Sequence, residues 1–437
     1  MGADVKQRGP VLATRRLGQF AWCSYDWANS AFPTVIVTFV FAAYFTKGVA
    51  ADEVVGTSQW SYAVSLSMLA TAVLGPFLGA IADHGGRRKP WVLAFTLVMA
   101  GSTAALWFAT PKIGDVWWVL LCFALANFAF ETGTIFYNAM LPSISPPAMI
   151  GRLSGWGWGL GYGGGLVCLV VTLFVLIRPD PPLFGLEAAL AQPVRASALL
   201  VAGWLLAFSL PFFLLTPDAV SNNLRPGEAM RRGASSLVST FRHLRRYRNV
   251  GLFLISHMVY TDGLNTLFSV GGIYAAVTFG MDLQELLLFG IALNVTAGLG
   301  AFAFGWVDDR IGPKPTILIA LGAIIVLGAG ILLVETKPLF WAFALPIGIF
   351  LGPAQSASRS MMARISPPDV ATEMFGLFAF SGKATAFMGP AIFGWMTWLS
   401  GSQRIGLSSI LLFLLAGAAL LGPVRQVQAP EGGECQP

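Results

Sequence analysis

Charged side chains are scarce in this chain, since Asp, Glu, Lys and Arg make up 11% of its 437 residues. Soluble globular proteins carry about 25%, so this composition excludes one large soluble domain. Cysteine and histidine are scarcer still, with four and three copies. The cysteines form no CxxC pair and the histidines are scattered, so we expect no disulfide framework, metal site or cofactor.

Two motifs are missing as well. No GxxxxGK[ST] loop for nucleotide phosphates occurs, which argues against ATP-driven work by this chain. Paired histidines or carboxylates at metal-ligand spacing are also missing, which argues against a membrane-embedded enzyme. We therefore expect a protein that is not an enzyme.

Hydrophobic residues are abundant, at 56% of the chain with a mean hydropathy of +0.70. Runs of roughly 20 apolar residues, enough to cross a bilayer, recur from end to end. We predict an all-α membrane protein with twelve transmembrane helices. The predicted spans are 18–46, 58–82, 90–109, 115–140, 153–177, 196–215, 249–279, 285–307, 314–334, 338–358, 370–398 and 405–423. A polar stretch, 216–248, separates a six-helix half (1–215) from a second one (249–437) as a cytoplasmic middle loop.

The distribution of Lys and Arg predicts the orientation. With the N-terminus inside, the inner segments hold 20 of these residues and the outer loops hold 6. Cytoplasmic loops carry such an excess, so we expect both termini in the cytoplasm. The same excess explains the net charge of +6 without nucleic acid as a partner. The polar, basic N-terminus has no signal-peptide pattern.

Three motifs recur in the two halves, in the same order. They are Asp26-x-x-Asn29-Ser30-x-Phe32 with Asp262-x-x-Asn265-Thr266-x-Phe268, Gly79-x-x-x-Asp83-x-x-Gly86 with Gly305-x-x-x-Asp309-x-x-Gly312, and ISPP at 144–147 with ISPP at 365–368. Their offsets are 236, 226 and 221 residues. Two parallel halves of six helices around a central cavity are the architecture of the major facilitator fold.

The segment GPFLGAIADHGGRRKP (75–90) resembles the loop signature of major facilitator transporters. The matching residues are Gly79, Asp83, Gly86, Arg87 and Arg88, and the second copy keeps Gly305, Asp309, Arg310 and Gly312. The resemblance implies a cytoplasmic gate formed by charged residues. We assign Asp83, Arg87, Arg88, Asp309 and Arg310 to it, and add Arg359 at the end of the tenth predicted span as a gate residue or cytoplasmic anchor.

A narrower resemblance extends over nearly the whole chain. The segments YDWANSAF, FYNAMLP, GWGLGYGGG, YTDGLNT, QSASRS and FGLFAFSGKATAFMGP resemble the autophagy-related vacuolar effluxer family. Its fungal members are implicated in the release of leucine, isoleucine and tyrosine, so the resemblance implies an amino acid as solute. The compact middle loop and short tails resemble the bacterial relatives, which implies a plasma-membrane location. The glycines of GWGWGLGYGG (155–164) also resemble an antiporter motif, although close helix packing explains them equally.

Polar and ionisable residues inside the predicted spans are the candidate site. An ionised Asp at a span centre costs about 2.5–3.5 kcal/mol on insertion, so it normally faces a cavity or a partner. Shared helix faces carry Asp26 and Asn29 in the first span, Asn127, Glu131 and Asn138 in the fourth, and Asp262 and Asn265 in the seventh. Lys383 lies inside the eleventh span, and Tyr162 inside the fifth. We expect Asp26, Glu131 and Asp262 to approach Lys383.

These residues predict a secondary transporter that moves a small polar solute by alternating access, with protons held by an acid in part of the cycle. A structural role for the duplicated pair Asp26 and Asp262 is the alternative at residue level. A flippase for lipids or lipid-linked sugars and an exporter of drugs or metabolites are the alternatives at protein level. The expected partners are the solute, H⁺ and the bilayer, and we expect a monomer.

Overall fold

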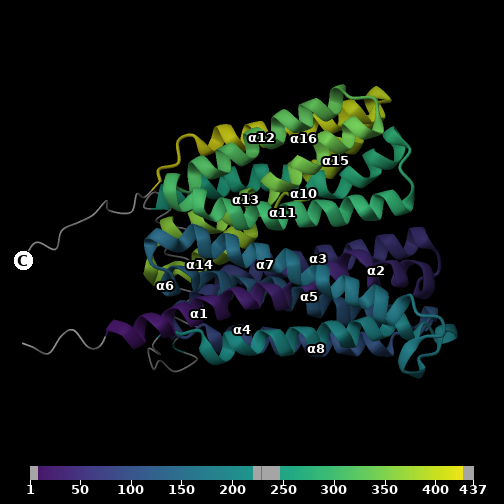
Figure 1. The fold of residues 1–437 in the computed structure, drawn as a ribbon, viewed down its shortest axis with the longest axis horizontal. Helices are drawn as coiled ribbons and strands as arrows, with labels where there is room; N and C mark the ends of the chain where they lie inside the picture. Colours follow the sequence, from purple (N-terminus) through teal and green to yellow (C-terminus); the bar gives the residue numbers. More distant parts are fainter. Residues whose placement is uncertain (1–7, 220–227, 229–246, 427–437) are drawn as a thin grey trace, which may run out of the picture.

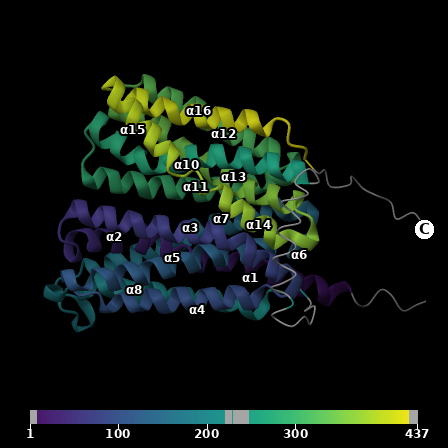
Figure 2. The same ribbon diagram turned by 180° about the vertical axis from the view of Figure 1, so that it is seen from behind.

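Two bundles of long helices lie side by side in the computed structural model, one above the other in Figure 1 and again when seen from behind in Figure 2. The model describes residues 8–219, 228 and 247–426. The lower bundle, coloured purple to teal, is the N-terminal half, and the upper one, green to yellow, is the C-terminal half. The first helix begins and the last one ends at the same end of the molecule, on the left in Figure 1. We call this end the terminus face.

The N-terminal half forms six membrane-length segments. They are α1 (Arg8–Asn29) with η1 (Phe32–Phe39), α2 (Phe41–Tyr44) and η2 (Phe45–Val49), then α3 (Glu53–Gly85), α4 (Lys89–Ala105), α5 (Val116–Ala139), α7 (Ile150–Val171) with η6 (Thr172–Ile177), and α8 (Gln192–Leu215). The short α6 (Leu141–Ile144) joins α5 to α7.

The C-terminal half repeats this pattern. Its segments are α10 (Arg248–Phe279), α11 (Leu283–Ile311), α12 (Pro313–Leu333), α13 (Lys337–Ile365), α14 (Ala371–Ser381) with α15 (Met388–Ser400), and α16 (Gln403–Leu421). The predicted twelve-helix fold in two halves is confirmed within the described residues. Most of the middle loop, 220–227 and 229–246, lies outside them.

Ten of the described segments are long and apolar enough to cross a membrane. The other two are α10, which carries the buried polar residues Ser256, His257 and Asp262, and the pair α14 and α15. The prediction of one continuous span at 370–398 was wrong in this detail. Residues 382–387 form turns between α14 and α15, so the eleventh span is broken in its middle.

The first span also changes its winding. α1 ends at Asn29, and a π-helical stretch begins at Phe32 with Pro33 near its start. Proline lacks the N–H that would continue the α-helical hydrogen bonds, which explains the change there. The irregular first and eleventh spans both contribute ionisable residues to the interior.

Small residues let helices of opposite halves pack closely near the terminus face. A Cβ atom on Gly155 of α7 would overlap the carbonyl oxygen of Ala301 on α11, and one on Gly376 of α14 would overlap Pro76 of α3. The glycine motif in 155–164 therefore packs helices together, as one of its two interpretations predicted. These glycines allow the backbones of the two halves to approach closely at this end.

Candidate functional site

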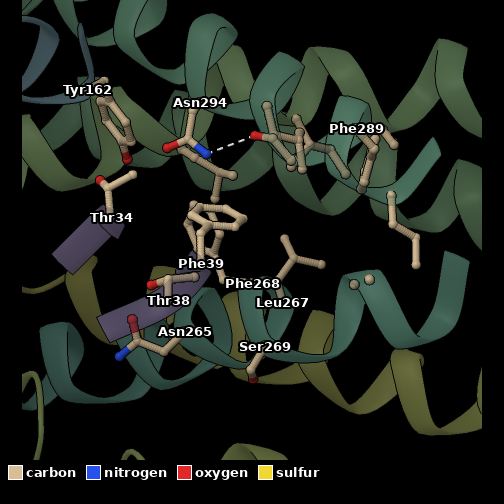
Figure 3. A pocket seen from close by; sticks show the side chains of 18 of the residues that line it. Thr34, Thr38, Phe39, Tyr162, Asn265, Leu267, Phe268, Ser269, Phe289 and Asn294 are labelled. Atoms are coloured by element: carbon tan, nitrogen blue, oxygen red, sulfur yellow. Dashed lines mark hydrogen bonds between the residues drawn. The ribbon is translucent and has the colours of Figure 1, made fainter. Parts of the chain in front are cut away.

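A cavity of about 710 Å³ lies between the halves, away from the terminus face. Figure 3 shows Thr34 and Thr38 of the first span, Tyr162 of α7, Asn265 and Ser269 of α10, and Asn294 and Phe289 of α11 around it. Most of the remaining lining is aromatic or aliphatic, such as Phe39 and Phe268. No charged side chain is among the described residues that line the cavity. It suits a small molecule with an apolar body and a few polar groups.

On the side of the cavity nearer the terminus face, Arg359 of α13 inserts between helices of the other half. Its side chain is 4% exposed, and Nη1 lies 2.9 Å from Oδ2 of Asp26 on α1. It also donates to Oδ1 of Asn138 over 3.2 Å, to Oγ of Ser154 over 2.9 Å and to the carbonyl of Ser154 over 2.6 Å. A C-terminal-half arginine thus neutralises an N-terminal-half aspartate across the interface.

Three aromatic rings surround the same guanidinium. Its carbon lies 5.0 Å from the ring centre of Trp22, 5.9 Å from that of Tyr137 and 5.7 Å from that of Trp158. Cations are attracted to such ring faces. Trp158 also lines the cavity, so this residue lies next to both the cavity and the guanidinium of Arg359. The pair of Asp26 and Arg359 therefore lies beside Trp158, at the end of the cavity nearer the terminus face, and we call this end the cavity floor.

A second ion pair crosses the interface between α5 and the broken eleventh span. Nζ of Lys383 lies 2.8 Å from Oε1 of Glu131, and both side chains are mostly buried. Lys383 sits in the turns between α14 and α15, where the chain leaves helical geometry. Lys383 thus meets Glu131, whereas Asp26 takes Arg359 as its partner.

Asp262 on α10 has a different environment from the other two acids. Its side chain is buried, and Oδ1 accepts a hydrogen bond of 3.2 Å from the backbone N–H of Gly389, in the first turn of α15. Oδ2 is buried without a hydrogen-bond partner among the described residues. The three acids therefore do not gather around one lysine.

The neutral residues of the predicted site divide into two groups. Tyr162 and Asn265 line the cavity, and the Tyr162 hydroxyl donates to Oε1 of Gln355 on α13 over 2.6 Å. Asn29, Asn127 and Asn138 are absent from the described lining. Asn29 bonds to Thr134 over 3.4 Å, and Asn127 donates to Ser67 over 2.7 Å inside the N-terminal half.

At the terminus face, Asp83 at the end of α3 binds the start of α14 in the other half. Its carboxylate accepts from the backbone N–H groups of Thr372 at 3.0 Å and Glu373 at 2.9 Å. Helix N-termini present unpaired N–H groups and partial positive charge, so they attract carboxylates. Arg88 lies 3.1 Å from Asp83 and donates to Thr372 over 2.8 Å, which ties three groups together.

Asp309 makes the corresponding contact in the opposite direction. At the end of α11, it accepts from the backbone N–H groups of Gly151 at 2.8 Å and Arg152 at 3.2 Å, at the start of α7. Its basic partners are Arg152, at 2.6 Å, and Arg364 of α13, at 3.2 Å. Each ISPP segment leads through a short 3-10 turn into the helix whose start receives the carboxylate. The repeated motifs thus form two equivalent contacts between the halves.

The basic members of the predicted gate differ in their burial. Arg87 and Arg310 are exposed, whereas Arg88 is buried. Sequence reasoning missed Arg152, Arg364 and the buried Asp308, which lies 3.7 Å from Arg364. The available signal was position in the sequence, because Arg152 and Arg364 lie close to the repeated ISPP segments and Asp308 adjoins the repeated Asp309.

Comparison with known proteins agrees with this architecture. The family described as "Vacuole effluxer Atg22 like" matches residues 14–431. A protein of Bacillus subtilis (strain 168), the uncharacterized MFS-type transporter YxiO, is 27% identical and covers 93% of this chain and 94% of its own. Autophagy-related protein 22 of Saccharomyces cerevisiae (strain ATCC 204508 / S288c) is 25% identical, with 83% of this chain and 76% of its own covered.

Solved structures of major facilitator transporters share the fold. The transporter FucP in its outward conformation aligns with a TM-score of 0.73 and 12% identity, over 95% of this chain and 100% of FucP. The proton:xylose symporter XylE aligns with a TM-score of 0.71 and 14% identity, over 95% of this chain and 96% of XylE. The chain belongs to the Atg22-like family of the major facilitator transporters, and it is an integral multi-pass membrane protein.

Proposed function

We propose that this Atg22-like transporter moves amino acids with apolar side chains across the membrane by alternating access. The observation that carries the proposal is the ion pair of Asp26 and Arg359 under the cavity floor, at 2.9 Å. An amino acid carries one carboxylate and one ammonium group. It can therefore form an ion pair with Arg359 and another with Asp26, in place of the ion pair between these two residues. The guanidinium is suited to the carboxylate, and Asp26 to the ammonium group.

The cavity supports the apolar part of this proposal. Its wall includes Phe39, Leu267, Phe268 and Phe289, which would receive a leucine or tyrosine side chain. Trp158 lines the cavity and lies next to Arg359, so a movement of this ring would open a path for the solute to the ion pair. The autophagy-related relatives, whose family is named for vacuolar efflux, favour an exported metabolite.

Proton coupling is part of the proposal. Two solved relatives in fold, FucP and XylE, are named as proton symporters.

The excess of Lys and Arg on one side supports a cytoplasmic terminus face. The contacts of Asp83 and Asp309 then close the cytoplasmic side, and the cavity belongs to the outward-facing state.

The experiment is uptake of labelled leucine and tyrosine into proteoliposomes containing the purified protein. We expect uptake that unlabelled leucine inhibits, and that N-acetyl-leucine and leucinamide do not, since each lacks one of the two charges. Glu131→Gln, which removes the charge opposite Lys383, should reduce uptake, and Asp180→Asn in an exposed loop is the control. A folded protein that takes up no amino acid would refute the solute class while leaving the fold intact.

The uncharged lining favours a second candidate, a neutral and largely apolar metabolite or drug. Such a solute would bind among the aromatic residues without reaching Arg359. Uptake insensitive to the charges of the analogues, or uptake of labelled sugars or drugs alone, would support this candidate.

A further inference from the structure

We propose that Asp262 is the residue that binds and releases the proton coupled to solute movement. This inference rests on the proposed transport function and assigns one site within it. In the described residues, Asp26 and Glu131 each have a basic partner from the opposite half, and Asp262 does not.

The surroundings of Asp262 favour a proton on its carboxyl group. Asp262 is 1% exposed, and its Oδ2 has no hydrogen-bond partner among the described residues. The backbone N–H of Gly389, at 3.2 Å, faces Oδ1, and the neutral side chain of Thr385 also interacts with this carboxyl group. A buried carboxylate without a counter-charge is strongly disfavoured. The neutral acid is therefore the form that fits this conformation.

The internal repeat explains why one aspartate is neutralised and the other is not. Asp26 and Asp262 occupy equivalent positions in α1 and α10. Arg359, the partner of Asp26, is related by the offset of the two ISPP segments to Asn138, which carries no charge. The duplicated site thus has a fixed cation on one side only.

Other ionisable groups near α10 are already engaged. Lys383, in the break next to α15, is paired with Glu131 at 2.8 Å. His257, on α10 itself, bonds to Ser381 of α14 over 2.8 Å. The helix α16 presents Leu414 near Gly263, and α13 presents Ser358 to Tyr260. None of these contacts provides a positively charged partner for Asp262.

The position of Asp262 also connects it to the solute and to the halves. Asn265, one turn further along α10, lines the cavity, so a proton and a solute would approach from the same side. Gly389 follows the break that contains Lys383. Because the break and the start of α15 are continuous in the chain, we expect a movement that separates Lys383 from Glu131 to shift the start of α15 relative to Asp262. One proton from the medium adds to the carboxylate to give the neutral acid, and its release on the other side restores the carboxylate.

The first test needs no solute. Infrared difference spectra of the purified protein, recorded as pH is raised, should show loss of the C=O stretch of a buried carboxylic acid. Asp262→Asn should abolish this signal, Asp262→Glu should shift it, and Asp180→Asn should leave it unchanged. If Asp262→Asn does not fold, Asp262→Glu decides. A signal that stays unchanged in the folded variants refutes the assignment.

The second test separates this inference from the proposed function. In proteoliposomes with an imposed proton gradient, Asp262→Asn should lose leucine accumulation but keep exchange of internal for external leucine. Accumulation that persists in Asp262→Asn, or parent transport that ignores the gradient, refutes the coupling role while leaving the transporter intact. If the parent moves no leucine at all, the proposed solute fails, and the infrared signal alone decides about Asp262.

Discussion

Arg359 shows how one buried cation connects two helical bundles. Its guanidinium has acceptors on α1, α5 and α7 and lies among three aromatic rings of the opposite half. Buried pairs of charges gain little net stability, because desolvation offsets their attraction. Removing one partner is costly, however, since the other remains buried and unpaired.

We therefore predict that Arg359→Gln destabilises the protein by about 3–5 kcal/mol, because it leaves Asp26 without a cation. Arg359→Lys should lose less, since it keeps the charge but not the several donors. The measurement is thermal unfolding in detergent, followed by tryptophan fluorescence. Adding Asp26→Asn to Arg359→Gln should recover part of the loss. Losses that simply add would mean that the pair is not coupled.

The depth of Arg359 could not be predicted from the sequence. The tenth span was predicted to end at residue 358, because arginine usually marks a membrane boundary, whereas α13 continues to Ile365. Hydrophobic length identifies a span but not the partner that its polar residues find in another half. For the same reason, the prediction that Asp26 approaches Lys383 was wrong. Asp26 pairs with Arg359, and Lys383 pairs with Glu131.

Helix elements were easier to predict than their interruptions. The apolar runs identified all twelve segments, and Pro33 explains the change in the first span. The break at 382–387 has no such signal, since its residues, GKATAF, contain no proline. It depends on tertiary contacts, such as the pair of Lys383 with Glu131.

The packing of α7 against α11 leads to a prediction about conformation. Gly155→Ala would place a methyl group against the Ala301 carbonyl in the other half, so it should push the halves apart at the terminus face. We expect a shift away from this conformation with little loss of fold. Gly203→Ala, also within a helix but with open space around it, is the matched control.

Spin labels can measure this shift. Ala148 and Asp369 are exposed and occupy equivalent places after the two ISPP segments, so cysteines there report the separation of the halves. Cys435 would be replaced by serine, and the three buried cysteines retained. The distance distribution should extend to longer values in Gly155→Ala only. An unchanged distribution would mean that α11 adjusts without moving the halves.

The molecule as a whole is held in this conformation by two equivalent contacts at the terminus face. Asp83 binds the start of α14, and Asp309 binds the start of α7. The repeat in the sequence predicted the pair of aspartates, because both follow the same glycine pattern. It could not predict that each would bind a helix start in the opposite half, since this depends on how the halves pack.

Because the two contacts act in parallel, we predict that Asp83→Asn and Asp309→Asn each shift the equilibrium partly and that the double variant shifts it further. Hydrogen bonds to charged groups contribute about 1.5–3 kcal/mol, and every 1.4 kcal/mol changes a population ratio about tenfold. The Ala148 and Asp369 labels should report a graded increase in separation, with leucine uptake falling in parallel. Asp180→Asn, the same change at an exposed residue outside the gate, should leave the distribution unchanged. If one single variant gives the same label separation as the double variant, only one of the two contacts holds the halves together.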